Sequence, residues 1–434
     1  MESLISVDRL RFLFNRLRDR LWVRPLVVCL LSIGAAFVAK LADGTKLAKF
    51  VPAITPDSIE TLLSIMASSM LIIATFSVGS MVSAFASASN TATPRSFSLV
   101  AADNVSQNAL STFVGAFIFS VVALTAFENA YFDKAGIFIL FVLTVSVFGI
   151  VIITFVRWVD SIARLGRLGQ TIKMVEKATI DAMKRRLEAP TLGGIPKQES
   201  QMRGQAVFAS SIGYVQHIDM SAIQTWAVEV DAQVVVMALP GTFASPDRIL
   251  AYVSISSDDA SESDLSCIVE AFQIGDDRLF EDDPRFGLVV LSEIAGRALS
   301  PAVNDPGSAI KIIGTLVRVF ALWDESAKVI NEKAPEYDRV EVPQISMRDM
   351  FDDAFTSIAR DGAGMVEVSV RLQKALHSLA SIDHAEIHDV ARYHGYLALE
   401  RAGKVLNMEQ DLAAVREAAS YEKTPVVAVT ESSS

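Results

Sequence analysis

Hydrophobic positions along the chain change their spacing near residue 157. Before that point four long apolar stretches, separated by short polar segments, predict membrane-spanning helices over about 26–42, 61–87, 108–127 and 136–156. After it, apolar residues recur every three or four positions, which predicts a juxtamembrane basic helix over 158–189 that continues the fourth span without a break. The pattern therefore predicts an α-helical membrane domain over 26–157, followed by a soluble region.

The soluble region changes period again after a linker at 190–204. Short β-type runs between turn signals predict a small β module over 205–255, with one of its strands at Val228–Val230. Residues 265–420 predict a mixed and then mainly helical domain, and 423–434 a disordered tail. The fold class predicted for this region is α+β.

The β module resembles the biotinyl or lipoyl type of barrel-sandwich domain. The resemblance covers about fifty residues and rests on Gly213-Tyr214-Val215, the run at Val234–Val236 and the turn at Pro240-Gly241. Such domains carry their cofactor on a lysine, but no lysine lies between Gln198 and Lys311. We therefore expect a structural or assembly module rather than a swinging arm.

The longest uncharged stretch is Thr61–Pro94, which contains the second span. As one helix it would be about 51 Å long, and the hydrocarbon core of a bilayer is only about 30 Å thick. The hydroxyl positions singled out near its end are Ser77, Ser80, Ser83 and Ser87. Two interpretations stay open: small residues allow close helix packing, or the hydroxyl groups line a watery path.

Charge distribution predicts the orientation and the partners. Six arginines in residues 1–25, interleaved with apolar residues, predict a basic amphipathic helix that binds anionic lipids, as the basic helix over 158–189 would. Basic flanks at both ends of the four spans place both termini in the cytoplasm. The N-terminus shows no small-residue cleavage site, so we expect a retained span. The net charge of −11 argues against a nucleic-acid partner.

Catalytic and metal-binding patterns are not evident in the sequence. It contains no Walker loop, no GxGxxG and no GxSxG motif. His384 and His388 have the spacing of a helical metal pair, but we interpret them as part of a solvated face. We expect no enzyme activity, no cofactor and no metal. The two cysteines, Cys29 and Cys267, suit a reducing compartment for the soluble region.

A helix–helix corner is predicted at Leu299–Pro306. Asp305 followed by Pro306 is an N-cap and N1 pair that starts a helix. The corner does not explain Arg297, which could hold an anion or a carboxylate of a neighbouring subunit. The candidate motif or interface residues are Arg95, Arg297, Ser300, Asn304 and Asp305.

Together, these features resemble a family of bacterial predicted inner-membrane proteins classed as a domain of unknown function. The matching features are Pro94-Arg95 after the Ser-rich span, Phe272–Gly275, Asp283–Gly287 and Arg297–Pro306. The resemblance covers nearly all of residues 20–400 and implies an inner-membrane location, but it implies no activity. One departure is visible, because Ala92-Thr93 stands where the family more often has a Gln-containing segment leading to Phe-Ser.

Four spans without buried charges cannot easily form a pathway within one subunit. We therefore expect a homo-oligomeric channel or pore-like protein with a cytoplasmic ring domain, and the basic collar of Arg157–Arg186 would favour anions. The alternative is a membrane-anchored scaffold or sensor whose soluble region binds a partner without transport.

Overall fold

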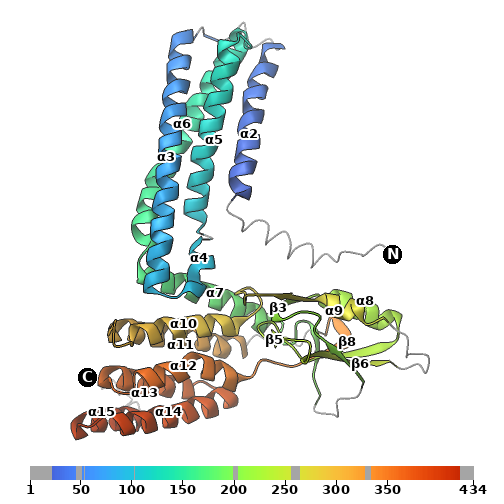
Figure 1. The fold of residues 1–434 in the computed structure, drawn as a ribbon, viewed down its shortest axis with the longest axis vertical. Helices are drawn as coiled ribbons and strands as arrows, with labels where there is room; N and C mark the ends of the chain where they lie inside the picture. The colour runs from blue at the N-terminus through green and yellow to red at the C-terminus, as the bar shows by residue number, and fades with distance from the viewer. Residues whose placement is uncertain are drawn as a thin grey trace, which may run out of the picture. The chain divides into compact units, whose positions relative to one another are not determined.

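The computed structural model describes residues 22–44, 51–52, 54–101, 103–198, 204–255, 264–327 and 334–420. The amphipathic helix predicted over 1–25 lies outside these ranges except for its last four residues, and the tail predicted over 423–434 lies wholly outside them. The chain divides into two compact units, Met1–Met174 and Val175–Ser434. The two units are described separately below (Figure 1).

The first unit contains four helices that are long and apolar enough to cross a membrane, which confirms this part of the prediction. They are α2 (Val23–Leu41), α3 (Pro56–Thr91), α5 (Asn104–Glu128) and α6 (Lys134–Leu165). Short turns η1 (Ala42–Gly44), η3 (Pro94–Ser96) and α4 (Phe97–Ala101) connect them. Helix α5 packs against the other three long helices, so it forms the centre of the unit (Figure 1).

Two features fix α2 against its neighbours. A Cβ atom at Gly115 of α5 would lie 2.4 Å from Cγ1 of Val28, so only glycine permits this close approach. At the other end of α2, the Asp43 carboxylate accepts hydrogen bonds from the backbone N–H of Asp133 at 2.9 Å and of Gly136 at 2.5 Å. Asp43 thereby ties the end of α2 to the first turn of α6.

The prediction of an unbroken helix from the fourth span to residue 189 is wrong. Helix α6 ends at Leu165, Gly166 is its C-cap, and α7 (Leu168–Glu188) begins after a turn. The hydroxyl group of Ser87 donates a hydrogen bond to the Gly166 carbonyl at 3.2 Å, so the turn is fastened to α3. Apolar spacing continues across this glycine, which is why the periodicity concealed the break.

The second unit contains two small sheets instead of the predicted barrel. The five-stranded sheet has the order β1 (Gly194–Pro196), β8 (Tyr337–Val342), β4 (Ala232–Val236), β6 (Ile249–Ile255) and β2 (Gln205–Phe208). The three-stranded sheet has the order β5 (Phe243–Ala244), β3 (Gly213–Ile218) and β7 (Phe272–Gly275). Both sheets are open within the described residues, because their outer strands have a single partner.

Strand β8 pairs in parallel with both β1 and β4, whereas the other pairs are antiparallel. Helices α8 (Met220–Glu229) and α9 (Ser266–Ala271) pack with the sheets, and Ile223 and Ile268 are fully buried in their shared core. The strand predicted at Val228–Val230 is wrong. Helix α8 runs to Glu229, and Asp231, with φ of 51°, turns the chain into β4.

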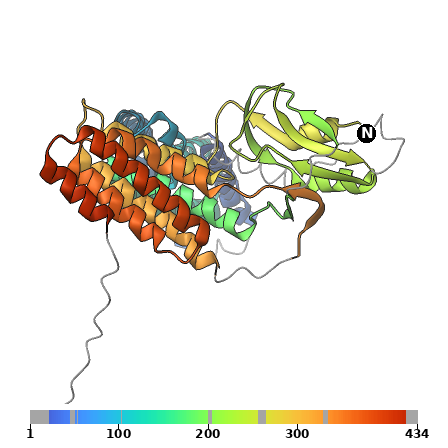
Figure 2. The same cartoon turned by 90° about the horizontal axis from the view of Figure 1, so that it is seen from below.

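Helices make up the rest of the second unit (Figure 2). They are α10 (Pro284–Ala298), α11 (Pro306–Ala327), α12 (Met347–Asp361), α13 (Val366–Ala380), α14 (Ala385–Val405) and α15 (Glu409–Ala419). Phe320 of α11 packs on Phe351 of α12 with ring centroids 4.4 Å apart. The later part of α7 joins this core, because Thr179 is fully buried and touches Gly287 of α10.

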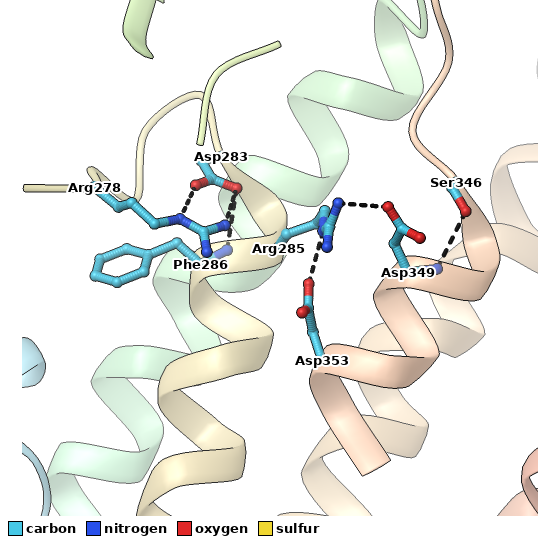
Figure 3. Close-up of polar contacts among 7 residues, drawn as sticks. All are labelled: Arg278, Asp283, Arg285, Phe286, Ser346, Asp349 and Asp353. Carbon is cyan, nitrogen blue, oxygen red and sulfur yellow. Dashed lines mark hydrogen bonds and ion pairs between the residues drawn. The ribbon is translucent and has the colours of Figure 1, made fainter. Parts of the chain in front are cut away.

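Arginines organise the segment that leads into α10. Arg278 binds the buried Asp283 carboxylate, and Arg285 donates to Asp349 and Asp353 of α12, at 2.7 Å in each case (Figure 3). From α7, Arg186 donates to the Asp282 carbonyl at 3.3 Å, and burial lowers the pKa of Arg186 to about 10. These contacts hold α7, α10 and α12 together at one end of the helical layer.

Candidate functional site on the third helix

Helix α3 presents small and hydroxyl-bearing residues along its uncovered face. The exposed positions of this kind are Ser64, Ser68, Thr75, Gly79, Ser83 and Ala86, and their angular spacing places them on one side of the helix. Ser68 and Thr75 each donate their hydroxyl proton to a carbonyl one turn earlier at 2.9 Å. Their oxygen lone pairs therefore remain directed away from the backbone. Exposed apolar residues, among them Ile65, Ile72 and Val82, lie on the same face.

The four serines proposed from the sequence occupy different environments. Ser83 is exposed, and Ser80 and Ser87 are half-buried. Ser77 is fully buried, and its hydroxyl oxygen has no hydrogen-bond partner among the described residues. Ser77 therefore lies in the packed interior and does not line an open surface. Ser64 and Ser68 were not among the four positions proposed from the sequence, because only the positions of the other helices decide which side of α3 is covered.

A groove of about 670 Å³ lies beside this face, between α3 and the end of α6. It is lined by Phe76, Gly79, Ser80, Ser83, Ala84, Ser87, Ile162, Ala163, Gly166 and Arg167. Ser80, Ser83 and Ser87 are therefore brought together, as their spacing predicted. Among the described residues that line the groove, Arg167 is the one with a charged side chain.

The groove lies beyond the level at which α2 begins. Arg24, next to the start of α2, donates to the Asn108 side chain at 3.1 Å. Ala109, which follows Asn108 in α5, belongs to one buried cluster with residues 66–74 of α3. From Pro56 to Thr75 an α-helix rises about 30 Å, which is the thickness of a hydrocarbon core. We therefore expect the groove at the mouth of the membrane region rather than in its middle.

The corner motif lies in the second unit and is built by local hydrogen bonds. The Asp305 carboxylate accepts hydrogen bonds from the Ser308 backbone N–H at 3.1 Å and from its hydroxyl at 2.6 Å, which is N-cap geometry for α11. These bonds from Ser308 lower the pKa of Asp305. Asn304 adopts a left-handed conformation with φ of 48°, and the Ser300 hydroxyl donates to the Arg297 carbonyl at 2.7 Å.

The two candidate arginines have separate surroundings. Arg297 is exposed, and its guanidinium makes no ion pair with any residue that the structure describes. The carboxylate of Asp305 is bound by Ser308, so the cap does not use the Arg297 guanidinium. Arg95 lies in η3, directly after α3, and its backbone N–H donates to the Thr93 hydroxyl at 3.4 Å.

Four apolar helices followed by a mixed α/β region define a membrane protein with a large extramembrane part. The chain belongs to the family described as predicted membrane protein DUF2254, whose model matches residues 18–378.

The chain is also similar to an uncharacterized protein of Mycobacterium tuberculosis (strain CDC 1551 / Oshkosh) and to one of Mycobacterium bovis. Each is 29% identical over 117 residues, which are 26% of this chain and 22% of the relative. The match thus spans about a fifth of the length of these curated relatives. No solved structure matches the chain.

Proposed function

We propose that this protein is a subunit of a homo-oligomeric membrane channel whose path is lined by the uncovered hydroxyl face of α3. The observation that carries the proposal is the exposure of Ser64, Ser68 and Thr75 within the length of α3 that can cross the bilayer. Hydroxyl oxygens can replace part of the hydration shell of a permeating ion. A purely lipid-facing surface gains nothing from them.

Assembly is part of the proposal, because one subunit does not enclose the face. Several copies with α3 towards a common axis would surround a path, and the exposed side chains of Ile65 and Ile72 would pack against the next subunit. The second unit then forms a ring in the cytoplasm, where the positive-inside rule places it, without enzyme activity.

Flux measurements on reconstituted protein test this function. Replacing Ser68 with Leu should narrow and dry the path, because apolar constrictions gate by loss of water, and ion flux should fall at least tenfold. Ser146 provides a matched control, since it is exposed on α6 and also donates its hydroxyl proton to a carbonyl one turn earlier. Ser146→Leu should leave the flux unchanged. A size-exclusion profile of each variant shows whether the oligomer persists.

Two results would contradict the channel. One is a well-folded wild-type oligomer that passes no ion at any voltage. The other is an equal loss of flux in the Ser68→Leu and Ser146→Leu proteins, because a general effect on the bilayer region would then explain both.

A scaffold or sensor is the second candidate, favoured by three exposed apolar side chains on the second unit. They are Phe208, Ile212 and Phe243, whose exposed fractions are 45%, 65% and 46%. Exposed apolar groups of this kind mark protein interaction sites. This function predicts an oligomer without flux in which Ile212→Ser removes partner binding and leaves folding intact.

A further inference from the structure

We infer that Arg167 sets the charge selectivity of the proposed path, making it prefer anions at its cytoplasmic mouth. The inference rests on the proposed channel and adds to it the class of ion and the residue that selects it. Three observations support it: the position of Arg167 in the groove, the absence of a compensating charge there, and the level of the groove along α3.

The groove places Arg167 next to the hydroxyl face. Ser83 and Ser87 of α3 line the groove together with Arg167, which follows the turn at Gly166. The Ser87–Gly166 hydrogen bond fixes that turn against α3, so the position of Arg167 relative to the serines is held by the fold. No carboxylate side chain lines the groove.

Two basic residues close to Arg167 in the sequence form ion pairs. Arg164, one turn earlier, forms an ion pair with Asp160, and Lys177 pairs with Asp181 at 2.6 Å. Among the described residues, the Arg167 guanidinium has neither an ion pair nor a side-chain hydrogen bond. Its full charge therefore acts on ions that enter the groove.

At the expected level of the groove, the Arg167 charge can change the local ion concentration without the free-energy cost of burial in the bilayer. At the mouth, Arg167 stays hydrated and avoids the penalty of a charge in the hydrocarbon core. For an ion about 8 Å away in water, one unit charge changes the local concentration about twofold. Arginines from several subunits around one axis multiply this effect, which weakens as salt is added.

Reversal potentials across liposomes in a KCl gradient test the inference on the full chain. The wild type should show a chloride-to-potassium permeability ratio above one. One unit charge changes the chloride and potassium concentrations about twofold in opposite directions, so it changes their ratio about fourfold. In Arg167→Glu, where the charge changes by two units, the ratio should fall about sixteenfold. Arg167→Gln should bring the ratio close to one, and Arg167→Lys should retain the wild-type ratio. Arg164→Glu is the matched control and should change the ratio less than twofold.

The outcomes separate the two proposals. If Arg167→Glu conducts with the wild-type ratio, the selectivity role is wrong and the channel stands. If Arg167→Glu does not fold, Arg167→Gln decides, and an unchanged ratio in that variant also overturns the inference. If wild-type oligomers do not conduct, the channel fails and the selectivity role fails with it.

Discussion

Arg278 donates two parallel hydrogen bonds to the Asp283 carboxylate, 2.7 Å from Nε to Oδ2 and 3.0 Å from Nη2 to Oδ1 (Figure 3). The same carboxylate caps α10 by accepting the Phe286 backbone N–H at 3.1 Å. Burial raises the pKa of Asp283, and the arginine opposes that shift. Gly241 packs directly against this carboxylate, because a Cβ atom at position 241 would lie 2.2 Å from Oδ2 of Asp283.

Replacing Arg278 with Met should therefore destabilise the second unit strongly. The buried carboxylate would lose its counter-charge, and breaking a buried pair in this way costs about 3–5 kcal/mol. Thermal denaturation in detergent measures the loss. Arg360→Met is the control, since Arg360 forms an exposed pair with Asp361, and such pairs contribute about 0–1 kcal/mol. An equal loss of thermal stability in both variants would show that the buried Arg278–Asp283 pair contributes no more than an exposed pair.

Glycine substitutions test the packing of the membrane helices. Gly115→Ala places a methyl group against Val28, a stiff β-branched side chain, and overpacking of this kind costs about 1–3 kcal/mol. Gly79→Ala meets no atom within 4 Å and should leave the thermal stability of the subunit unchanged. Adding Val28→Ala to Gly115→Ala should restore stability. If Gly79→Ala is as harmful as Gly115→Ala, the assigned contact between α2 and α5 is not the cause.

The N-cap at Asp305 predicts which side chains can replace it and how the stability depends on pH. Asp305→Ala should cost about 0.5–2 kcal/mol, and Asp305→Asn or Asp305→Ser should recover most of it, because those side chains also cap helices. The folded-state pKa of Asp305 is lowered. Its carboxylate contribution is therefore present above the unfolded pKa of about 3.9 and is lost as the pH falls through the folded value. Melts between about pH 2 and about pH 5, which bracket the titration of the unfolded and the folded carboxylate, should show a smaller acid loss in Asp305→Asn.

His394 should make the second unit less stable in mild acid. Its side chain is 2% exposed and packs near Phe351 of α12. Burial lowers the pKa of His394, with Asp352 acting in the opposite direction and Arg401 and Arg348 reinforcing the shift. The unfolded chain then binds a proton before the folded one does, so stability falls as the pH decreases below about 6.5. His394→Gln should flatten that part of the stability–pH curve, and an unchanged slope would exclude His394 as the cause.

Thiol labelling tests the orientation of the chain in the membrane. In a protein whose two cysteines are replaced by alanine, Asn129→Cys lies between α5 and α6, and Ala302→Cys lies on the exposed corner before α11. The positive-inside rule predicts that an impermeant reagent added to whole cells labels the first and not the second. The reverse labelling pattern would show that the termini face outward.

Hydrophobicity was sufficient to predict the four long helices, because each needs only its own sequence to satisfy its backbone. The pairing of β1 with β8 could not be predicted in that way. Gly194 lies opposite Tyr337, and strands this short gain their stability from partners far away in the sequence. The candidate site shows the same limit. Helical spacing grouped Ser80, Ser83 and Ser87, but packing against α5 decided that Ser77 is interior.

The position of β8 between β1 and β4 has a consequence for any attempt to divide the second unit. The chain completes its five-stranded sheet only after it has made α9, α10 and α11. A fragment that stops after β6 would leave the edges of β1 and β4 without partners, and unpaired edges invite aggregation. Helices α10 and α11 thus form an insertion between strands of one sheet. The sheets and the helical layer should consequently be expressed, and degraded by proteases, as a single folded unit.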